Sequence, residues 1–124
     1  MSVERVFLTG ASSGIGEALA RHYAATGATL GLAARRQHRL SALAASLPGT
    51  HACYRLDVAD AASLQAAAAD FIARFGCPDI VIANAGVSVG TLADRADDLA
   101  AFNRVFQTNV IGMAQTFQPF IAAM

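Results

Sequence analysis

The chain has 124 residues, of which 55% are hydrophobic and 15% are charged, a size and composition that fit one domain with a hydrophobic core. Nine basic residues balance nine acidic ones, so the charge indicates neither nucleic acid nor a membrane surface as a partner. Both charge signs precede a very short apolar run at the amino terminus, a pattern that excludes a signal peptide and a membrane-spanning helix. We therefore expect a cytoplasmic protein.

Strand-like apolar runs alternate with helical patterns along the whole chain. Strands are predicted at residues 3–8, 29–33, 51–56 and 79–83, and helices at 14–26, 35–47, 60–75 and from 97 or 98 to about 122. This alternation predicts one α/β domain over residues 1–124, a doubly wound parallel sheet of the Rossmann type in strand order 3-2-1-4. The fourth strand reads as the kind buried on both faces, and we expect its residues 80–82 to form an open edge of the sheet. Asp60 is expected to cap the third helix, and Gly112 and Pro119 are expected to bend the last one.

A glycine-rich turn, Thr-Gly-Ala-Ser-Ser-Gly-Ile-Gly at residues 9–16, joins the first strand to the first helix. The first N–H groups of a helix have no acceptor within it, and their partial positive charge suits a phosphate. We expect the glycines to let a pyrophosphate approach the backbone; a turn without a ligand is the alternative. A P-loop is excluded because the chain contains no lysine. The residues expected to bind the nucleotide here are Gly10, Ser12, Ser13, Gly14, Ile15 and Gly16.

The spacing Thr-Gly-x-x-x-Gly-x-Gly resembles the glycine motif of the short-chain dehydrogenase/reductase family. Later segments resemble the same family in the same order: Asp57 with Val58, then Asn84-Ala85-Gly86, then Asn109. The resemblance implies that Asp57 contacts the adenine ring with Val58 beside it, and that residues 84–86 support the sheet and approach the cofactor ribose. It also implies that Asn109 belongs to the catalytic Asn-Ser-Tyr-Lys group, in which the asparagine helps to hold a water.

Plainer interpretations of these residues remain open from sequence alone. Asp57 is equally well explained as a turn-forming or capping residue, and Asn109 as an ordinary residue within a helix. Asn84 and Gly86 are residue types that tolerate unusual backbone angles.

The arginines after the second predicted strand bear on the choice of nucleotide. In the common dinucleotide fold an acid at this strand end binds the ribose hydroxyls of NAD, but no acid occurs from residue 18 to residue 56. Guanidinium groups suit a ribose 2′-phosphate, so we expect NADP, bound chiefly by Arg35. Arg36 is expected to stack on adenine or to share the phosphate. The alternative is that both arginines belong to a solvated helix start.

The two cysteines, Cys53 and Cys77, lack the spacing of metal ligands. We expect both to be reduced and structural, and we expect no metal site.

The resemblance implies an oxidoreductase that acts on an alcohol/carbonyl pair as a small-molecule substrate. The family supplies the proton with a serine and a Tyr-x-x-x-Lys pair, whereas this chain has only Tyr23, Tyr54 and no lysine. We therefore expect the cofactor-binding half of a longer protein, inactive by itself, whose full-length form is a homo-oligomer. The alternatives are a non-catalytic NADP-binding module and an inactive truncated fragment whose last helix pairs with another chain.

Overall fold

The computed structural model describes residues 3–12, 14–88 and 94–124. Four parallel strands form one sheet in the order β3-β2-β1-β4, which confirms the predicted arrangement. Along the chain they are β1 (Arg5–Thr9), β2 (Thr29–Ala34), β3 (His51–Arg55) and β4 (Ile80–Ile82). Because all four strands are parallel, their carboxyl ends meet at one edge of the sheet.

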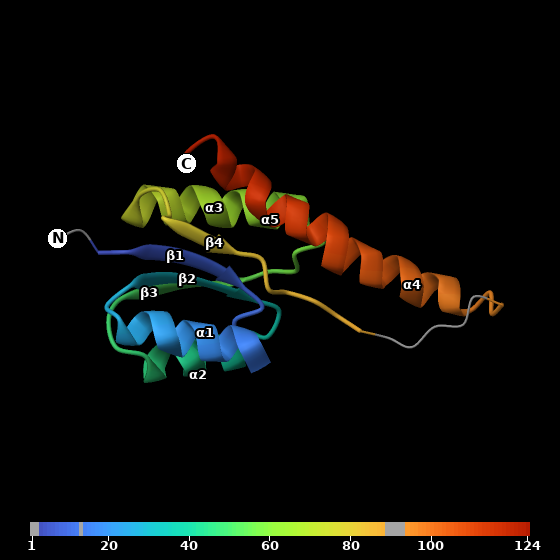
Figure 1. Cartoon of the computed structure of the whole chain (residues 1–124), viewed down its shortest axis with the longest axis horizontal. Helices are drawn as coiled ribbons and strands as arrows, with labels where there is room; N and C mark the ends of the chain where they lie inside the picture. The colour runs from blue at the N-terminus through green and yellow to red at the C-terminus, as the bar shows by residue number, and fades with distance from the viewer. Residues whose placement is uncertain (1–2, 13, 89–93) are drawn as a thin grey trace.

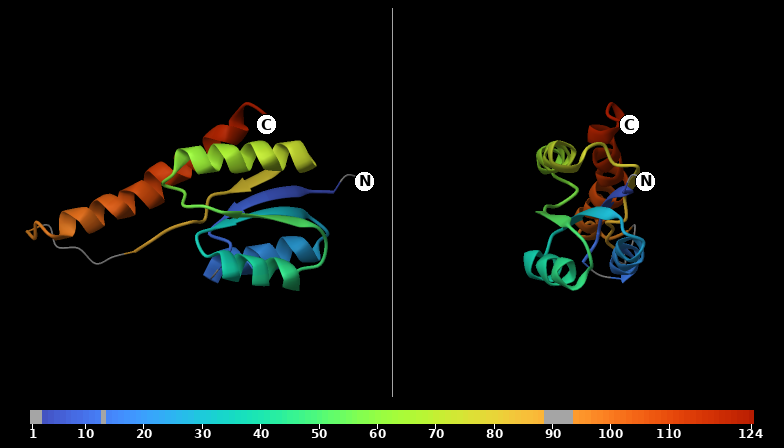
Figure 2. Two further views of the ribbon diagram at one scale, coloured as in Figure 1. Left: turned by 180° about the vertical axis from the view of Figure 1, so that it is seen from behind. Right: turned by 90° about the vertical axis from the view of Figure 1, so that its left-hand side faces the viewer.

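Helices cover both faces of this sheet (Figures 1 and 2). One face carries α1 (Gly14–Ala25) and α2 (Gln37–Ser46), and the other carries α3 (Ala61–Phe75) and α5 (Gly112–Ile121). Gly27 follows α1 with φ of 90°, the left-handed conformation that glycine adopts at helix ends. The Asp60 carboxylate accepts a hydrogen bond from the Ser63 N–H, as predicted for the cap of α3.

The alternation of side chains along β1 divides the core into two clusters, one on each face of the sheet. Val6 and Leu8 pack in the first cluster with residues of β2, α1 and α2. Phe7 points the other way and packs with Phe71 of α3 and Phe120 of α5. All five side chains are fully buried, so the apolar pattern of the sequence is sufficient to place these elements.

The fourth strand lies at an open edge of the sheet, as predicted, but is less buried than its apolar sequence indicates. Its three residues are each half-buried, because β4 lies at an edge of the sheet and pairs only with β1 among the described strands. A continuous apolar run does not distinguish an edge strand from a central one.

The last predicted helix is continuous, but its irregular turn does not lie at the expected positions. It consists of α4 (Asp98–Phe106), a π-helical segment η1 (Gln107–Ile111) and α5, so the regular α-helix is interrupted just before Gly112 and not at Pro119. In Figure 1, α4 extends beyond the end of the sheet.

None of the helices in the described ranges is long and apolar enough to span a bilayer.

Candidate functional site

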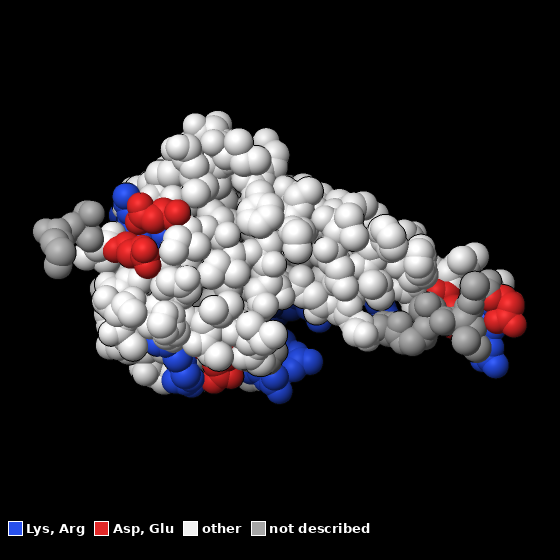
Figure 3. All heavy atoms as spheres, in the orientation of Figure 1, with Lys and Arg blue, Asp and Glu red and all other residues white. Residues whose placement is uncertain are grey.

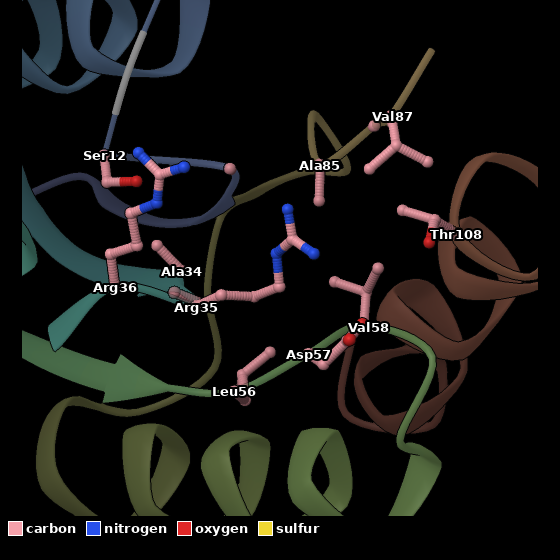
Figure 4. Close-up of a pocket in the computed structure, with 13 residues that line it drawn as sticks. Ser12, Ala34, Arg35, Arg36, Leu56, Asp57, Val58, Ala85, Val87 and Thr108 are labelled. Atoms are coloured by element: carbon pink, nitrogen blue, oxygen red, sulfur yellow. The ribbon is translucent and has the colours of Figure 1, made fainter. Parts of the chain in front are cut away.

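A cavity of about 150 Å³ opens where the carboxyl ends of the four strands meet (Figure 4). The β1–α1 turn, the ends of β2 and β3, the segment after β4 and η1 all contribute to its wall. The lining includes the predicted residues Gly10, Ser12, Arg35, Arg36, Asp57, Val58, Ala85 and Gly86. Residues from five separate segments of the chain are thus brought to one place.

Two glycines of the glycine turn, Gly10 and Gly16, are required by close packing within the protein itself. A Cβ on Gly10, where φ is 66°, would lie 2.9 Å from the Ala85 Cα. A Cβ on Gly16 would collide with the Gly10 carbonyl oxygen. Only Gly14, with φ of 58°, has open space beside it. Packing within the protein therefore requires glycine at residues 10 and 16, and the expectation that all three glycines admit a ligand stays a prediction.

The amino-terminal end of α1 faces solvent beside the cavity. Gly14 and Ile15 are exposed, and the Ile15 side chain retains 72% of its accessible surface. The first N–H groups of this helix therefore lie where an anion can reach them. Ser13, which was expected to contribute here, lies outside the described residues.

The wall after β4 is attached to β1 by a buried hydroxyl that the sequence did not single out. Thr9 is 1% exposed, and its Oγ1 accepts hydrogen bonds from the N–H groups of Asn84 at 3.0 Å and Ala85 at 3.2 Å. The Asn84 side-chain amide donates to the Gly10 carbonyl at 3.3 Å. Asn84 thus lies behind the cavity and supports the glycine turn. A hydroxyl at the end of a strand before a glycine turn is the signal that was available for Thr9.

Neither Asn84 nor Gly86 has the positive φ that its residue type tolerates. No described non-glycine residue has a positive φ, and Gly86 is not among the glycines that do. The side-chain bond of Asn84 and the close approach of Gly86 to Asn109 explain these residues better. A Cβ on Gly86 would lie 3.3 Å from the Asn109 Oδ1.

The two arginines after β2 are exposed and line the cavity. In Figure 4 the Arg36 side chain points toward Ser12 of the glycine turn, and Arg35 extends between Ala85 and Asp57. Neither arginine forms an ion pair with any residue in the described part of the chain. The position at the strand end itself is Ala34, which is buried and carries no charge.

Asp57 combines a turn-forming bond with a place in the cavity wall. Its carboxylate accepts a hydrogen bond from the Ala59 N–H at 3.0 Å, as an aspartate does in an Asx turn, and the residue is exposed. The next residue, Val58, is 5% exposed and also lines the cavity. The turn-forming interpretation of Asp57 is therefore correct and does not exclude contact with a ligand.

Asn109 does not line the cavity but holds a segment that does. Its side chain accepts a hydrogen bond from the Val87 N–H and donates one to the Val87 carbonyl, both at 2.8 Å. Val87 and Thr108 belong to the cavity wall, and neither was identified from the sequence. Their proximity to Asn84-Ala85-Gly86 and Asn109 along the chain was the available signal.

Both tyrosines lie away from the cavity. Tyr23 packs against the first core cluster. The Tyr54 hydroxyl donates a 2.7 Å hydrogen bond to Asp70. Burial, followed by that bond, raises the pKa of Tyr54 well above its ordinary value, so this phenol is a poor proton donor or base near neutral pH.

The cysteines are half-buried and free. Burial raises the pKa of the Cys53 thiol, which keeps it in its less reactive protonated form. The described residues contain no cluster of His, Cys, Asp and Glu that could hold a metal ion.

The fold and this geometry agree with comparisons to known proteins. The family model described as short chain dehydrogenase matches residues 4–124. The NADPH-dependent pterin aldehyde reductase of Arabidopsis thaliana is 32% identical over 126 residues, which cover 100% of this chain and 52% of the reductase.

Two solved structures are similar along nearly the whole chain. An alcohol dehydrogenase from Thermococcus sibiricus complexed with 5-hydroxy-NADP has a TM-score of 0.90 and 31% identity, covering 98% of this chain and 53% of that one. The 3-ketoacyl-(acyl-carrier-protein) reductase of Brucella melitensis complexed with NADH has a TM-score of 0.89 and 25% identity, covering 97% and 49%.

This chain spans about half the length of these three proteins. The match nevertheless includes the glycine turn, all four strands and the helix that carries Asn109. The chain belongs to the short-chain dehydrogenase family of oxidoreductases, whose members use NAD or NADP.

Proposed function

We propose that this chain forms the nucleotide-binding part of an NADP-dependent oxidoreductase that acts on an alcohol/carbonyl pair. The observation that carries the choice of NADP is the pair of arginines at the cavity, which have no ion-pair partner among the described residues. An NAD-binding site of this type has an acid at the end of the second strand, where this chain has Ala34. Two unpaired guanidinium groups suit a 2′-phosphate instead.

The residues present fit both charged groups of such a nucleotide, the diphosphate and the 2′-phosphate. The open space beside Gly14 and the exposed start of α1 accommodate a diphosphate. Arg35 and Arg36 follow β2 and line the same cavity as Gly10 and Ser12 of the glycine turn, as expected where the adenosine ribose lies beyond the end of the second strand.

We assign the remaining roles by the position of each residue around the cavity. Gly10 and Ser12, with Gly14, Ile15 and Gly16 at the start of α1, form the diphosphate cradle. Asp57 and Val58 border the adenine, and Ala85 and Gly86 border the nicotinamide-side ribose, with Asn84 behind them. Asn109 holds Val87 and so shapes the end of the cavity nearest the reaction.

The bound nucleotide supplies or accepts the hydride, and a separate group has to move a proton at the substrate oxygen. We propose that this chain by itself binds the nucleotide without performing the transfer. The chain has no lysine, and neither of its tyrosines borders the cavity. Purified chain is expected to bind NADPH and to show no reduction of aldehydes or ketones above background.

The choice of NADP is tested by replacing the arginines one at a time. Charge-assisted hydrogen bonds contribute about 1.5–3 kcal/mol each, so Arg35→Ala is expected to weaken NADPH binding roughly tenfold or more. NADH binding, measured in parallel by nucleotide fluorescence, is expected to change little. Arg39→Ala is the matched control, because Arg39 is exposed on α2 and does not line the cavity. An unchanged NADPH/NADH affinity ratio in both Arg35→Ala and Arg36→Ala would contradict the proposal.

We also propose that α4 and α5 pair with a second copy of this chain. The outward face of these helices and of η1 between them carries large exposed apolar side chains: Leu99, Phe102, Phe106, Val110, Met113 and Phe117. The surface along these helices is almost without charged side chains (Figure 3). Monomeric proteins rarely expose so continuous an apolar surface.

A further inference from the structure

The last helix touches the cavity wall on two sides through side chains that do not themselves enter the cavity. Asn109 binds the backbone of Val87. Two turns further along, the side-chain amide of Gln115 donates a 2.7 Å hydrogen bond to the Val58 carbonyl. Val58 and Val87 both line the cavity, so the helix joins two of its walls.

The approach of the helix to Val58 is unusually close. A Cβ on Gly112 would lie 2.6 Å from the Val58 Cγ2, so only glycine permits this contact. With Gly112 packed against the side chain and Gln115 bonded to the carbonyl, both polar and apolar parts of Val58 are fixed by the helix.

Apart from the Val58 carbonyl, nothing around Gln115 in the described part of the chain explains why this residue has an amide side chain. Its side chain lies in an outer groove lined by Ala61, Val110, Ile111 and Ala114, with Gln65 and Gln118 as the other polar residues. A leucine would pack in this groove as well as glutamine does. The feature that needs the amide is the Val58 carbonyl, which an apolar side chain would leave without this donor.

We propose that Gln115 is a positioning residue that sets the separation of the Val58 and Val87 walls and thereby the affinity for the adenosine half of the nucleotide. This inference rests on the nucleotide site proposed above. Without the bond, the Asp57–Val58 segment loses its attachment to the helix while retaining its Asx turn. The adenosine half then has to order this wall when it binds, which lowers its affinity.

The test compares Gln115→Leu with Gln118→Leu. Gln118 lies in the same groove one turn further along α5, so its replacement makes the same change of chemistry without affecting Val58. We expect Gln115→Leu to weaken the binding of NADPH and of adenosine 2′,5′-bisphosphate by about three- to tenfold, the effect of one neutral hydrogen bond. Binding of nicotinamide mononucleotide is expected to be unchanged, and Gln118→Leu is expected to match the original chain for all three ligands.

A second pair of variants tests whether weaker binding results from misfolding. Gln115→Glu keeps the size of the side chain but at neutral pH cannot donate to a carbonyl, and Gln118→Glu adds the same charge nearby. The thermal unfolding midpoint is recorded for each variant, and affinities are compared well below it. A lower midpoint with unchanged affinity in both Gln115 variants shows a purely structural role and overturns the inference, as does an equal loss for the adenosine and nicotinamide fragments.

The outcomes also separate this inference from the one on which it rests. If the original chain does not bind NADPH, the proposed function fails and the positioning role fails with it. If the original chain binds NADPH and the Gln115 variants bind the adenosine fragment equally well, only the positioning role fails.

Discussion

The buried hydroxyl of Thr9 joins the end of β1 to the segment that follows β4. One oxygen accepts two backbone N–H groups, from Asn84 and Ala85, which are 75 and 76 residues away in the sequence. Buried N–H groups without acceptors are costly, so this hydroxyl determines where the cavity wall lies relative to the glycine turn.

The role of Thr9 predicts different results for two similar replacements. Thr9→Val keeps the shape but removes the acceptor, leaving two N–H groups unsatisfied at a cost of about 1–3 kcal/mol each. We expect a clearly lower denaturation midpoint and weaker NADPH binding, measured by urea unfolding and fluorescence titration. Thr9→Ser retains the hydroxyl and is expected to stay close to the original chain in both measurements. Equal behaviour of the two variants would show that the hydroxyl is not what holds the wall.

At the scale of single elements, helix α3 depends on its amino-terminal cap. Asp60 accepts hydrogen bonds from the Ser63 N–H and, at 2.7 Å, from the Ser63 hydroxyl. These bonds favour the ionised carboxylate and lower the pKa of Asp60. Because the folded-state pKa is below the unfolded one, the stabilisation is complete above the unfolded value and is lost as the pH falls through the folded value.

The cap therefore predicts a pH-dependent effect of replacing Asp60. Asp60→Ala is expected to lower the thermal midpoint near neutral pH, and the difference from the original chain is expected to shrink as the pH falls below the unfolded pKa of about 3.9 and through the lower folded-state pKa. Asp60→Asn keeps a capping oxygen that does not titrate and is the control. Thermal melts at intervals from about pH 3 to pH 7 measure both effects, and a deficit of Asp60→Ala that persists unchanged at the acid end would count against this account.

Local sequence patterns were sufficient to predict the helices and strands. They were not sufficient to predict the tertiary contacts between these elements. The glycine turn, the Asp60 cap and the strand order follow from residues adjacent in sequence or from the rules of parallel sheets. The bond between Gln115 and Val58 joins residues 57 positions apart, and no local pattern marks either partner. The π-helical turn at Gln107–Ile111 was missed for the same reason: the contacts of Asn109 with Val87 and of Gly112 with Val58 are tertiary.

The residues of the candidate site that follow strand ends could also be predicted from the sequence. Gly10 and Arg35 lie directly after strands, Asp57 and Ala85 lie within three residues of strand ends, and parallel topology brings such positions together. The sequence could not show that Gly10 and Gly16 serve internal packing, because the atoms they contact include Asn84 and Ala85, far along the chain.

At the scale of the whole molecule, the two sides of the sheet differ in what they present to solvent. The face of α4 and α5 is apolar and includes Phe102, 50% exposed, whose ring stacks near that of Phe106. Removing the exposed part of such apolar side chains from water favours association with another apolar surface.

This exposed face predicts concentration-dependent self-association. Phe102→Glu is expected to lower the average mass measured by sedimentation equilibrium, because it places a charge in the contact. His38→Glu adds the same charge on α2, on the other face of the sheet, and is expected to leave the mass unchanged. The pairing proposal fails if the original chain sediments as a monomer at high concentration, or if both variants shift the mass equally.

The interior position of β1 has a consequence for the order of events during synthesis. Val6 pairs with Leu30 on one side and with Ile80 on the other, so the ribosome delivers three helices and two strands before the second edge of β1 is covered. Non-local pairing of this kind is slow. The cavity takes its last walls from residues 85–87 and 108, and a nascent chain therefore acquires the capacity to hold a nucleotide only near the end of translation of this region.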